Sequence, residues 1–230
     1  STASGGALLV RSASATLTNC VFTNNHADYD GGAVFNRSSA TSLTECAFTG
    51  NTAQNPDSSD CYGGALCNYY SPAPSLSGCS FSGNHGKGGG GAILNFESSP
   101  SVSECDFQDN SSGDDTHGGA IYNYHVESAP VISDCTFTRN TTPNRGGAIY
   151  NYQAAPVISG CEFTQNTSDD EGGAINNRLC GPACIERGCT FTNNTAAGCG
   201  GGIYNNESSV TIEDCDFYGN NVLSTGSGGG

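Results

Sequence analysis

Residues 146–166 read GGAIYNYQAAPVISGCEFTQN, and the two motifs in this stretch decide the fold. The first is Gly-Gly-Ala followed by an aliphatic residue, and the second is Cys-x-Phe-x-x-Asn. The glycine motif or its Gly-Gly-Gly-Ile variant begins at Gly5, Gly31, Gly63, Gly90, Gly118, Gly146, Gly172 and Gly200. The second motif begins at Cys20, Cys46, Cys79, Cys105, Cys135, Cys161, Cys189 and Cys215. Because the motifs alternate at spacings of 26–33 residues, the chain consists of eight copies of one unit.

The repeated unit predicts short β-strands rather than helices. It is rich in Gly, Ser, Thr and Asn, and it lacks apolar residues spaced three and four apart. Its inward positions alternate instead: Cys161 shares a face with Phe163, and Ile149 shares one with Asn151. Three short strands per unit, joined by tight corners, form a parallel β-helix whose coils stack about 4.8 Å apart. We therefore expect an all-β, single-stranded, pectin-lyase-like parallel β-helix solenoid of about eight coils, roughly 38–40 Å long.

Stacking places the same residue type in one column of successive coils. We expect two interior columns, a Phe column from Phe22 to Phe217 and an aliphatic column from Leu8 to Ile203. Two Asn ladders, from Asn25 to Asn220 and from Asn36 to Asn205, mark the corners. Asn suits such a corner because its amide donates and accepts hydrogen bonds and because it tolerates a left-handed backbone.

The repeated Gly-Gly-Ala-[Ile/Leu/Val] and Phe-x-x-Asn tetrapeptides resemble the repeats of the chlamydial polymorphic outer membrane proteins. The resemblance runs from Gly5 to Gly230, nearly the whole chain. It implies a right-handed parallel β-helix displayed outside the cell, often as an adhesin. This chain departs from the family pattern by carrying a Cys in every coil.

Composition excludes several classes of partner. The chain has 7 Lys and Arg against 22 Asp and Glu, and a net charge of −15. Nucleic acids and anionic membrane surfaces attract clustered basic residues, so neither is an expected partner. No apolar run approaches the roughly 18–20 residues of a membrane span, so we expect no membrane insertion by this chain.

Aromatic residues outside the interior columns form the best candidate binding surface. This aromatic stripe comprises Tyr69, Phe96, Tyr122, Tyr124, Tyr150 and Tyr152. By alternation from the inward Ile and Asn, all six side chains should face outward, with Arg37 and Arg178 flanking them. An exposed aromatic patch often contacts sugar or protein, although a stack that only stiffens the rod explains the pattern equally well.

Acidic loops on one edge of the rod are the candidate cation site. The segments before the glycine pairs contain Asp28, Asp30, Asp114, Asp115, Asp169, Asp170 and Glu171. Stacked carboxylates repel one another, and calcium accepts several oxygen ligands. Calcium is thus the one candidate cofactor, and a solvated acidic edge is the alternative.

The cysteines divide into two groups. The eight that precede each Phe should be buried thiols, because disulfides between stacked neighbours would be strained. Among the others, Cys61–Cys67 and Cys180–Cys184 are candidate local disulfides of an extracellular protein. The spacing of Cys180, Cys184 and Cys189 is atypical for zinc. Candidate glycosylation sites are Asn193 and Asn206, since other sequons coincide with the Asn ladders.

The sequence favours a non-enzymatic, extracellular or cell-surface protein. Lys87 is the only Lys, and no motif joins converging carboxylates to a basic residue as polysaccharide cleavage requires. We expect one domain over residues 1–230, uncapped at both ends, acting as an adhesin or as a head-to-tail stacking unit of a surface fibre. Its partner would be a second copy, or a protein or glycan of a host or cell surface. The alternative is a β-helix that binds or cleaves polysaccharide.

Overall fold

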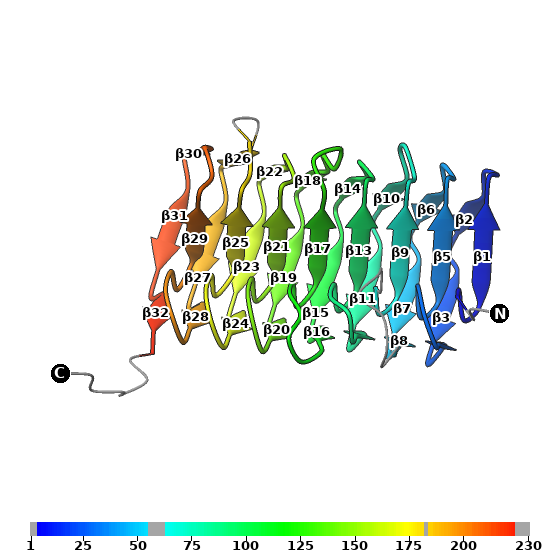
Figure 1. The fold of residues 1–230 in the computed structure, drawn as a ribbon, viewed down its shortest axis with the longest axis horizontal. Helices are drawn as coiled ribbons and strands as arrows, with labels where there is room; N and C mark the ends of the chain where they lie inside the picture. The colour runs from blue at the N-terminus through cyan, green and yellow to red at the C-terminus, as the bar shows by residue number, and fades with distance from the viewer. Residues whose placement is uncertain (1–3, 55–62, 182–183, 224–230) are drawn as a thin grey trace.

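The computed structural model describes residues 4–54, 63–181 and 184–223, and within these ranges it contains 32 strands and no α-helix. Each coil contributes four strands, and each strand pairs in parallel with the equivalent strand of the adjacent coils. The result is four eight-stranded sheets wrapped around one interior. Figure 1 shows the coils stacked in chain order along a rod. The predicted all-β parallel solenoid of about eight coils is confirmed.

The first two sheets are built from strands of three or four residues. The first sheet contains β1 (Leu8–Arg11), β5 (Val34–Arg37), β9 (Leu66–Tyr69), β13 (Ile93–Phe96), β17 (Ile121–Tyr124), β21 (Ile149–Tyr152), β25 (Ile175–Arg178) and β29 (Ile203–Asn206). The second contains β2 (Thr16–Thr18), β6 (Ser42–Thr44), β10 (Ser75–Ser77), β14 (Ser101–Ser103), β18 (Val131–Ser133), β22 (Val157–Ser159), β26 (Cys184–Arg187) and β30 (Val210–Glu213).

The other two sheets follow the Cys-x-Phe-x-x-Asn motif. The third contains β3 (Val21–Thr23), β7 (Ala47–Thr49), β11 (Ser80–Ser82), β15 (Asp106–Gln108), β19 (Thr136–Thr138), β23 (Glu162–Thr164), β27 (Thr190–Thr192) and β31 (Asp216–Tyr218). The fourth contains β4 (His26–Ala27), β8 (Thr52–Ala53), β12 (His85–Gly86), β16 (Ser111–Ser112), β20 (Thr141–Thr142), β24 (Thr167–Ser168), β28 (Thr195–Ala196) and β32 (Asn221–Val222).

The fourth sheet corrects the expectation of three strands per coil. Its strands are two residues long and directly follow the corner Asn. They form because the backbone stays in register with its neighbours, as where Thr141 N donates to Asn110 O at 2.9 Å. Two residues cannot display an alternating pattern, so the sequence carries no periodic signal for them.

The Phe and aliphatic columns line the interior as predicted. From Phe22 to Phe217, successive rings stack with centroids 4.7–4.9 Å apart and planes within 8° of parallel. The aliphatic column is buried beside them from Val34 to Ile175. Each buried side chain of this size contributes about 1.5–3 kcal/mol before chain entropy is subtracted.

Both Asn ladders are continuous hydrogen-bonded columns. Asn140, for example, donates from Nδ2 to Asn166 Oδ1 at 3.0 Å and to Phe107 O at 2.9 Å. The left-handed residue at this corner is the one before the ladder Asn, such as Arg139 with φ of 52°. The ladder Asn was therefore correctly assigned to the corner, but its amide hydrogen bonds and not its backbone conformation explain its use.

Each glycine pair meets two different steric demands. Gly146 has a φ of 69°, in the left-handed region that favours glycine. Gly147 passes so close to the adjacent coil that a Cβ would overlap Gly173 O. The pair therefore lets the chain turn and enter the first sheet beside its neighbour, which sets the coil spacing at the candidate surface.

Candidate binding surface

The outer face of the first sheet holds the predicted aromatic stripe. In β17, Ile121 and Asn123 point into the coil, so Tyr122 and Tyr124 point away from it. Parallel pairing places Tyr122 beside Tyr150 of β21, and Tyr124 beside Tyr152. The predicted outward direction of both columns is thus correct, but their exposure differs.

The column nearer the glycine pair is mostly covered, which corrects the expectation of exposure for Tyr150, while Tyr122 is half-buried. Tyr150 is 2% exposed, and Phe35, Cys67 and Leu94 of the same column are also buried. The segments that lead into the glycine pairs fold over it: the His117 ring lies 4.3 Å from that of Tyr150, and Gly89 lies against the Tyr122 ring. We call this the covered column. It forms a second apolar cluster outside the coil interior.

The other column, which we call the aromatic column, is half-exposed. It consists of Tyr69, Phe96, Tyr124 and Tyr152. Tyr69 and Phe96 stack at 5.0 Å with an interplanar angle of 21°, so their faces are mostly turned toward each other. Phe96 and Tyr124 meet edge to face at 69°, and Tyr124 and Tyr152 are tilted by 44°. The Tyr124–Tyr152 end thus offers ring surface that is not fully used by stacking.

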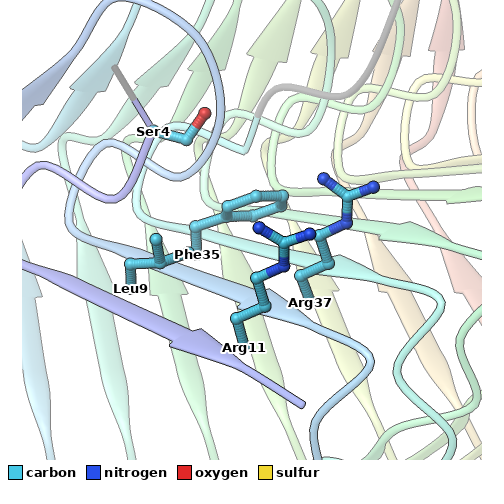
Figure 2. Close-up of a pocket in the computed structure, with 5 residues that line it drawn as sticks. All are labelled: Ser4, Leu9, Arg11, Phe35 and Arg37. Atoms are coloured by element: carbon cyan, nitrogen blue, oxygen red, sulfur yellow. The ribbon is translucent and has the colours of Figure 1, made fainter. Parts of the chain in front are cut away.

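Arginines continue the aromatic column toward the N-terminus. The Arg37 guanidinium lies 5.6 Å from the centroid of the Tyr69 ring, and Arg11 pairs in register with Arg37. The two guanidinium groups extend in the same direction beside the Phe35 ring (Figure 2), and with Leu9 and Ser4 they line a pocket of about 180 Å³. Like charges directly opposite on adjacent strands repel, so an anion would be favoured here.

Carboxylates pair with only some of the arginines that the structure describes. Among the described residues, the arginines within ion-pair distance of a carboxylate are Arg139, Arg145 and Arg187. Arg11 and Arg37 are not among them. The arginine pocket is therefore a local basic site on a chain of net charge −15.

A polar cluster supports the C-terminal half of the surface. The Tyr150 hydroxyl is hydrogen-bonded with Arg145 and Arg178, and burial raises the pKa of Tyr150 against the effect of these two charges. Burial and then the charges of Arg145 and Arg178 lower the pKa of His117 to about 4. His117 is consequently neutral at neutral pH and packs as an aromatic ring.

The acidic candidates for calcium do not converge. Arg145 Nε pairs with Asp170 at 3.1 Å and with Glu171 at 3.0 Å, so an arginine supplies the counter-charge there. The other acidic side chains are separate: Asp28 pairs with His26 at 3.3 Å, Asp30 accepts from Ser4 at 3.1 Å, and Asp114, Asp115 and Asp169 are exposed. Across residues 4–54, 63–181 and 184–223, no three His, Cys, Asp or Glu side chains are placed to hold a metal ion.

The predicted disulfide and glycosylation residues lie in different environments. Cys61 is outside the described residues, and Cys67 is buried in the covered column. Cys180 and Cys184 are both buried thiols at the corner between the first and second sheets. Asn193 is exposed, and half-buried Asn206 donates to the Tyr204 hydroxyl at 3.3 Å. The coil cysteines from Cys46 to Cys189 are buried thiols, as expected.

Sequence reasoning missed Glu186, which lies beside Cys184. Glu186 is 0% exposed and stands in register with Ile158 and Ile212, so it replaces an aliphatic residue of the second sheet. Its Oε1 accepts from Asn177 Nδ2 at 3.0 Å, while Oε2 has no hydrogen-bond partner. Burial raises the pKa of Glu186 to about 7. A carboxylate in an aliphatic column was the available signal.

A membrane-spanning helix is not found in the part of the chain that the structure describes, since none of its elements is a long apolar helix.

Comparison with known proteins identifies the family. A family model described as the right-handed beta helix region matches residues 5–181. The Chlamydia polymorphic membrane protein repeat matches residues 188–206, which include β27 and β29. No curated protein and no solved structure matches the chain. The two family matches indicate a surface-associated β-helix protein. The chain therefore belongs to the right-handed beta helix family and carries a repeat of the Chlamydia polymorphic membrane protein type.

Proposed function

We propose that this chain is a non-enzymatic extracellular adhesin that binds a glycan or protein of another cell through the aromatic column and the arginine pocket. The observation that carries the proposal is the half-exposed aromatic column, continued by Arg37 at one end and Arg178 at the other. Tyrosine with arginine is the composition typical of binding hot spots. Surface display is supported by the polymorphic membrane protein repeat.

Rigidity supports this role. The aromatic column is mounted on the first sheet, whose inward side is held by the Asn ladder with side-chain hydrogen bonds of 2.8–3.0 Å from Asn36 to Asn205. A surface whose side chains are already placed loses little conformational entropy on binding. Glu97, which follows Phe96 of the aromatic column, pairs with His125 at 3.2 Å, and Asp170 and Glu171 pair with Arg145, so each of these carboxylates already has a partner.

Binding of the purified chain to cultured epithelial cells tests the proposal. Fluorescent beads coated with the chain should adhere, and the double variant Tyr124→Ala, Tyr152→Ala should lose most of that adhesion while keeping the parent circular dichroism. The matched control is Thr138→Ala, Thr164→Ala, which changes outward residues of the third sheet in the same two coils. Equal adhesion by both double variants would refute the role of the aromatic column.

Enzymatic treatment of the cells identifies the class of partner. Loss of adhesion after glycosidase treatment identifies a glycan, and loss after protease treatment alone identifies a protein. The non-enzymatic part of the proposal is tested with polygalacturonate, with and without calcium. Release of unsaturated or reducing ends above the level of the boiled protein would refute it.

A second candidate is end-to-end stacking of copies, because parallel coils can pair through the same backbone hydrogen bonds whether they belong to one chain or to two. Negative-stain electron microscopy at two concentrations tests this: a fibre would repeat at about 38 Å per copy, and isolated rods at both concentrations would reject it.

A further inference from the structure

By residue count, the corner between the first and second sheets is longest in coils 5 (β17–β20) and 7 (β25–β28). Cys180 lies two positions after the paired residue Arg178, and the equivalent residues of other coils are Ser39, Ser71, Ser98, Val126, Ala154 and Ser208. On the second-sheet side, the residues in register with Cys184 are Thr41, Pro74, Pro100, Pro130, Pro156 and Val210. These two positions are two residues apart in most coils, three in coil 3 and four in coils 5 and 7, and coil 7 has a Cys at both.

Register places Cys180 and Cys184 within disulfide reach. Strands β25 and β26 pair in normal register with both neighbouring coils. Cys180 and Cys184 are therefore as far apart in space as the equivalent residues of most other coils, which are separated by only two positions in the sequence. Two residues of extended chain span at most about 7 Å. The Cα atoms of disulfides are usually about 4.4–6.8 Å apart. The geometry of the corner therefore suits a bridge between these residues.

Both thiols point into the same buried corner. Cys180 Sγ lies 3.5 Å from Asn151 O, as Ser71 Oγ lies 3.2 Å from Asn36 O in coil 3. Cys184 Sγ lies 3.7 Å from Asn177 Oδ1, a contact that Thr41 makes with Asn36 in coil 2. The two thiols are also hydrogen-bonded to each other. The sulfur atoms thus meet at the position where a bridge would lie.

The environment distinguishes the two sulfur atoms. Their mutual hydrogen bond lowers the pKa of Cys180 and, together with burial, raises the pKa of Cys184. Cys184 Sγ donates to Glu186 Oε1 across 3.9 Å, a hydrogen bond that favours the protonated thiol of Cys184. In the packed corner Cys180 is consequently the more acidic of the two thiols.

We propose that Cys180 and Cys184 form a disulfide that links the two ends of the longer corner of coil 7. The oxidant is a small disulfide of the oxidised-glutathione class. The Cys180 thiolate attacks one of its sulfur atoms, which forms a mixed disulfide and releases one small thiolate. Cys184 sulfur then attacks the Cys180 sulfur, and the second small thiolate leaves. The two protons lost by the protein thiols end on the two small thiols, and the oxidant takes up both electrons.

The bridge would hold β26 in register with the neighbouring coils. Because both sulfur atoms are buried in the closed corner, the mixed disulfide forms before β26 packs, and the second step accompanies packing. The closed bridge then fixes β26 beside β22 and β30 across the extra residues. This inference is independent of the proposed adhesion, because oxidation can be tested on the purified chain alone.

Peptide mapping tests the bridge directly. The full chain is refolded in a mixture of reduced and oxidised glutathione, denatured without reductant, alkylated with iodoacetamide and digested with trypsin. The expected peptide spans residues 179–187 and contains Cys180 and Cys184 as its only cysteines. It should be two hydrogen atoms lighter than the dithiol and free of label, and it should take two labels after reduction. Cys105 and Cys135, by contrast, should be labelled without reductant.

Serine variants give the second readout. Cys184→Ser should leave Cys180 open to alkylation. Reductant should lower the melting temperature of the parent chain but not that of the double variant Cys180→Ser, Cys184→Ser. Two labels on residues 179–187 without reductant would overturn the proposal. So would a link from either residue to another cysteine, or equal responses of parent and double variant to reductant.

Discussion

Replacing Glu186 by Gln should change how the stability of the fold depends on pH. Glu186 is fully buried, its Oε1 accepts from Asn177, and its Oε2 has no partner. A charged carboxylate is therefore unfavourable in the folded chain, and the carboxyl is held neutral. Cys180 and Cys184 are the other titratable groups of this corner. Gln keeps the shape and the acceptor oxygen of Glu186 but cannot ionise.

The magnitude follows from the raised pKa. Burial moves the pKa of Glu186 from 4.5 to about 7. Below pH 4.5 the group is protonated in both the folded and the unfolded chain, so it costs nothing. As pH rises above 4.5 the unfolded chain releases the proton and the folded chain does not, so stability falls until about pH 7. With about 1.36 kcal/mol per pKa unit, the loss is about 3 kcal/mol.

Urea unfolding followed by circular dichroism measures this loss, because the chain has no Trp. The free energy of unfolding of Glu186→Gln minus that of the parent should increase by about 3 kcal/mol between pH 4.5 and pH 7.5. Exposed Glu162, in the preceding coil, provides the matched control Glu162→Gln, whose difference from the parent should stay nearly constant. Hydrogen exchange of β26 locates the effect in the chain.

Two results would refute the reasoning. A difference between Glu186→Gln and the parent that does not change with pH would show that the carboxyl is solvated or paired. A difference that decreases as pH rises would show that the carboxylate form is the favoured one in the folded chain.

Three further changes test other parts of the fold. His117→Gln should make the fold less sensitive to acid, the reverse of the pH dependence at Glu186. Folding lowers the pKa of His117 from 6.5 to about 4, so the parent loses up to about 3 kcal/mol of stability as pH drops from 6.5 to 4. A variant that loses as much stability in acid as the parent would contradict this. Phe137→Ala should cost about 3–5 kcal/mol by leaving a cavity in the Phe column, and a thermal melt like the parent's would show that Phe137 is not interior. Asn140→Ala should cost about 3 kcal/mol or more, because it removes the buried hydrogen bonds from Asn110 N and Nδ2 to Asn140 Oδ1 and from Asn140 Nδ2 to Phe107 O; urea unfolding with a loss below about 1 kcal/mol would argue against the ladder.

The interior columns could be predicted because a repeated sequence places the same residue at the same position of every coil. A Phe that recurs at one position in eight units must meet its copies when coils stack, and the observed spacing of 4.7–4.9 Å follows from parallel strand pairing. The same logic predicted the Asn ladders. The fourth strand of each coil was not predicted, because a segment of two residues has no periodicity.

The candidate surface was predicted less well, since alternation reports the direction of a side chain and not what covers it. Tyr150 and Tyr152 both point away from the coil, yet the segments before the glycine pairs cover Tyr150 and leave Tyr152 half-exposed. Those segments vary in length and composition between coils, so no repeat pattern predicts where they pack.

Sequence by itself determined the solenoid, its eight coils, its columns and its acidic charge, because these depend on local periodicity and on composition. Tertiary structure alone decided which aromatic rings stay exposed, that Arg145 supplies the counter-charge for Asp170 and Glu171, and that Glu186 is fully buried beside Cys184. Each of these depends on a contact between residues of different coils or across a corner of irregular length. Such contacts are set by the packing of non-repeated segments, which the period of the repeat does not encode.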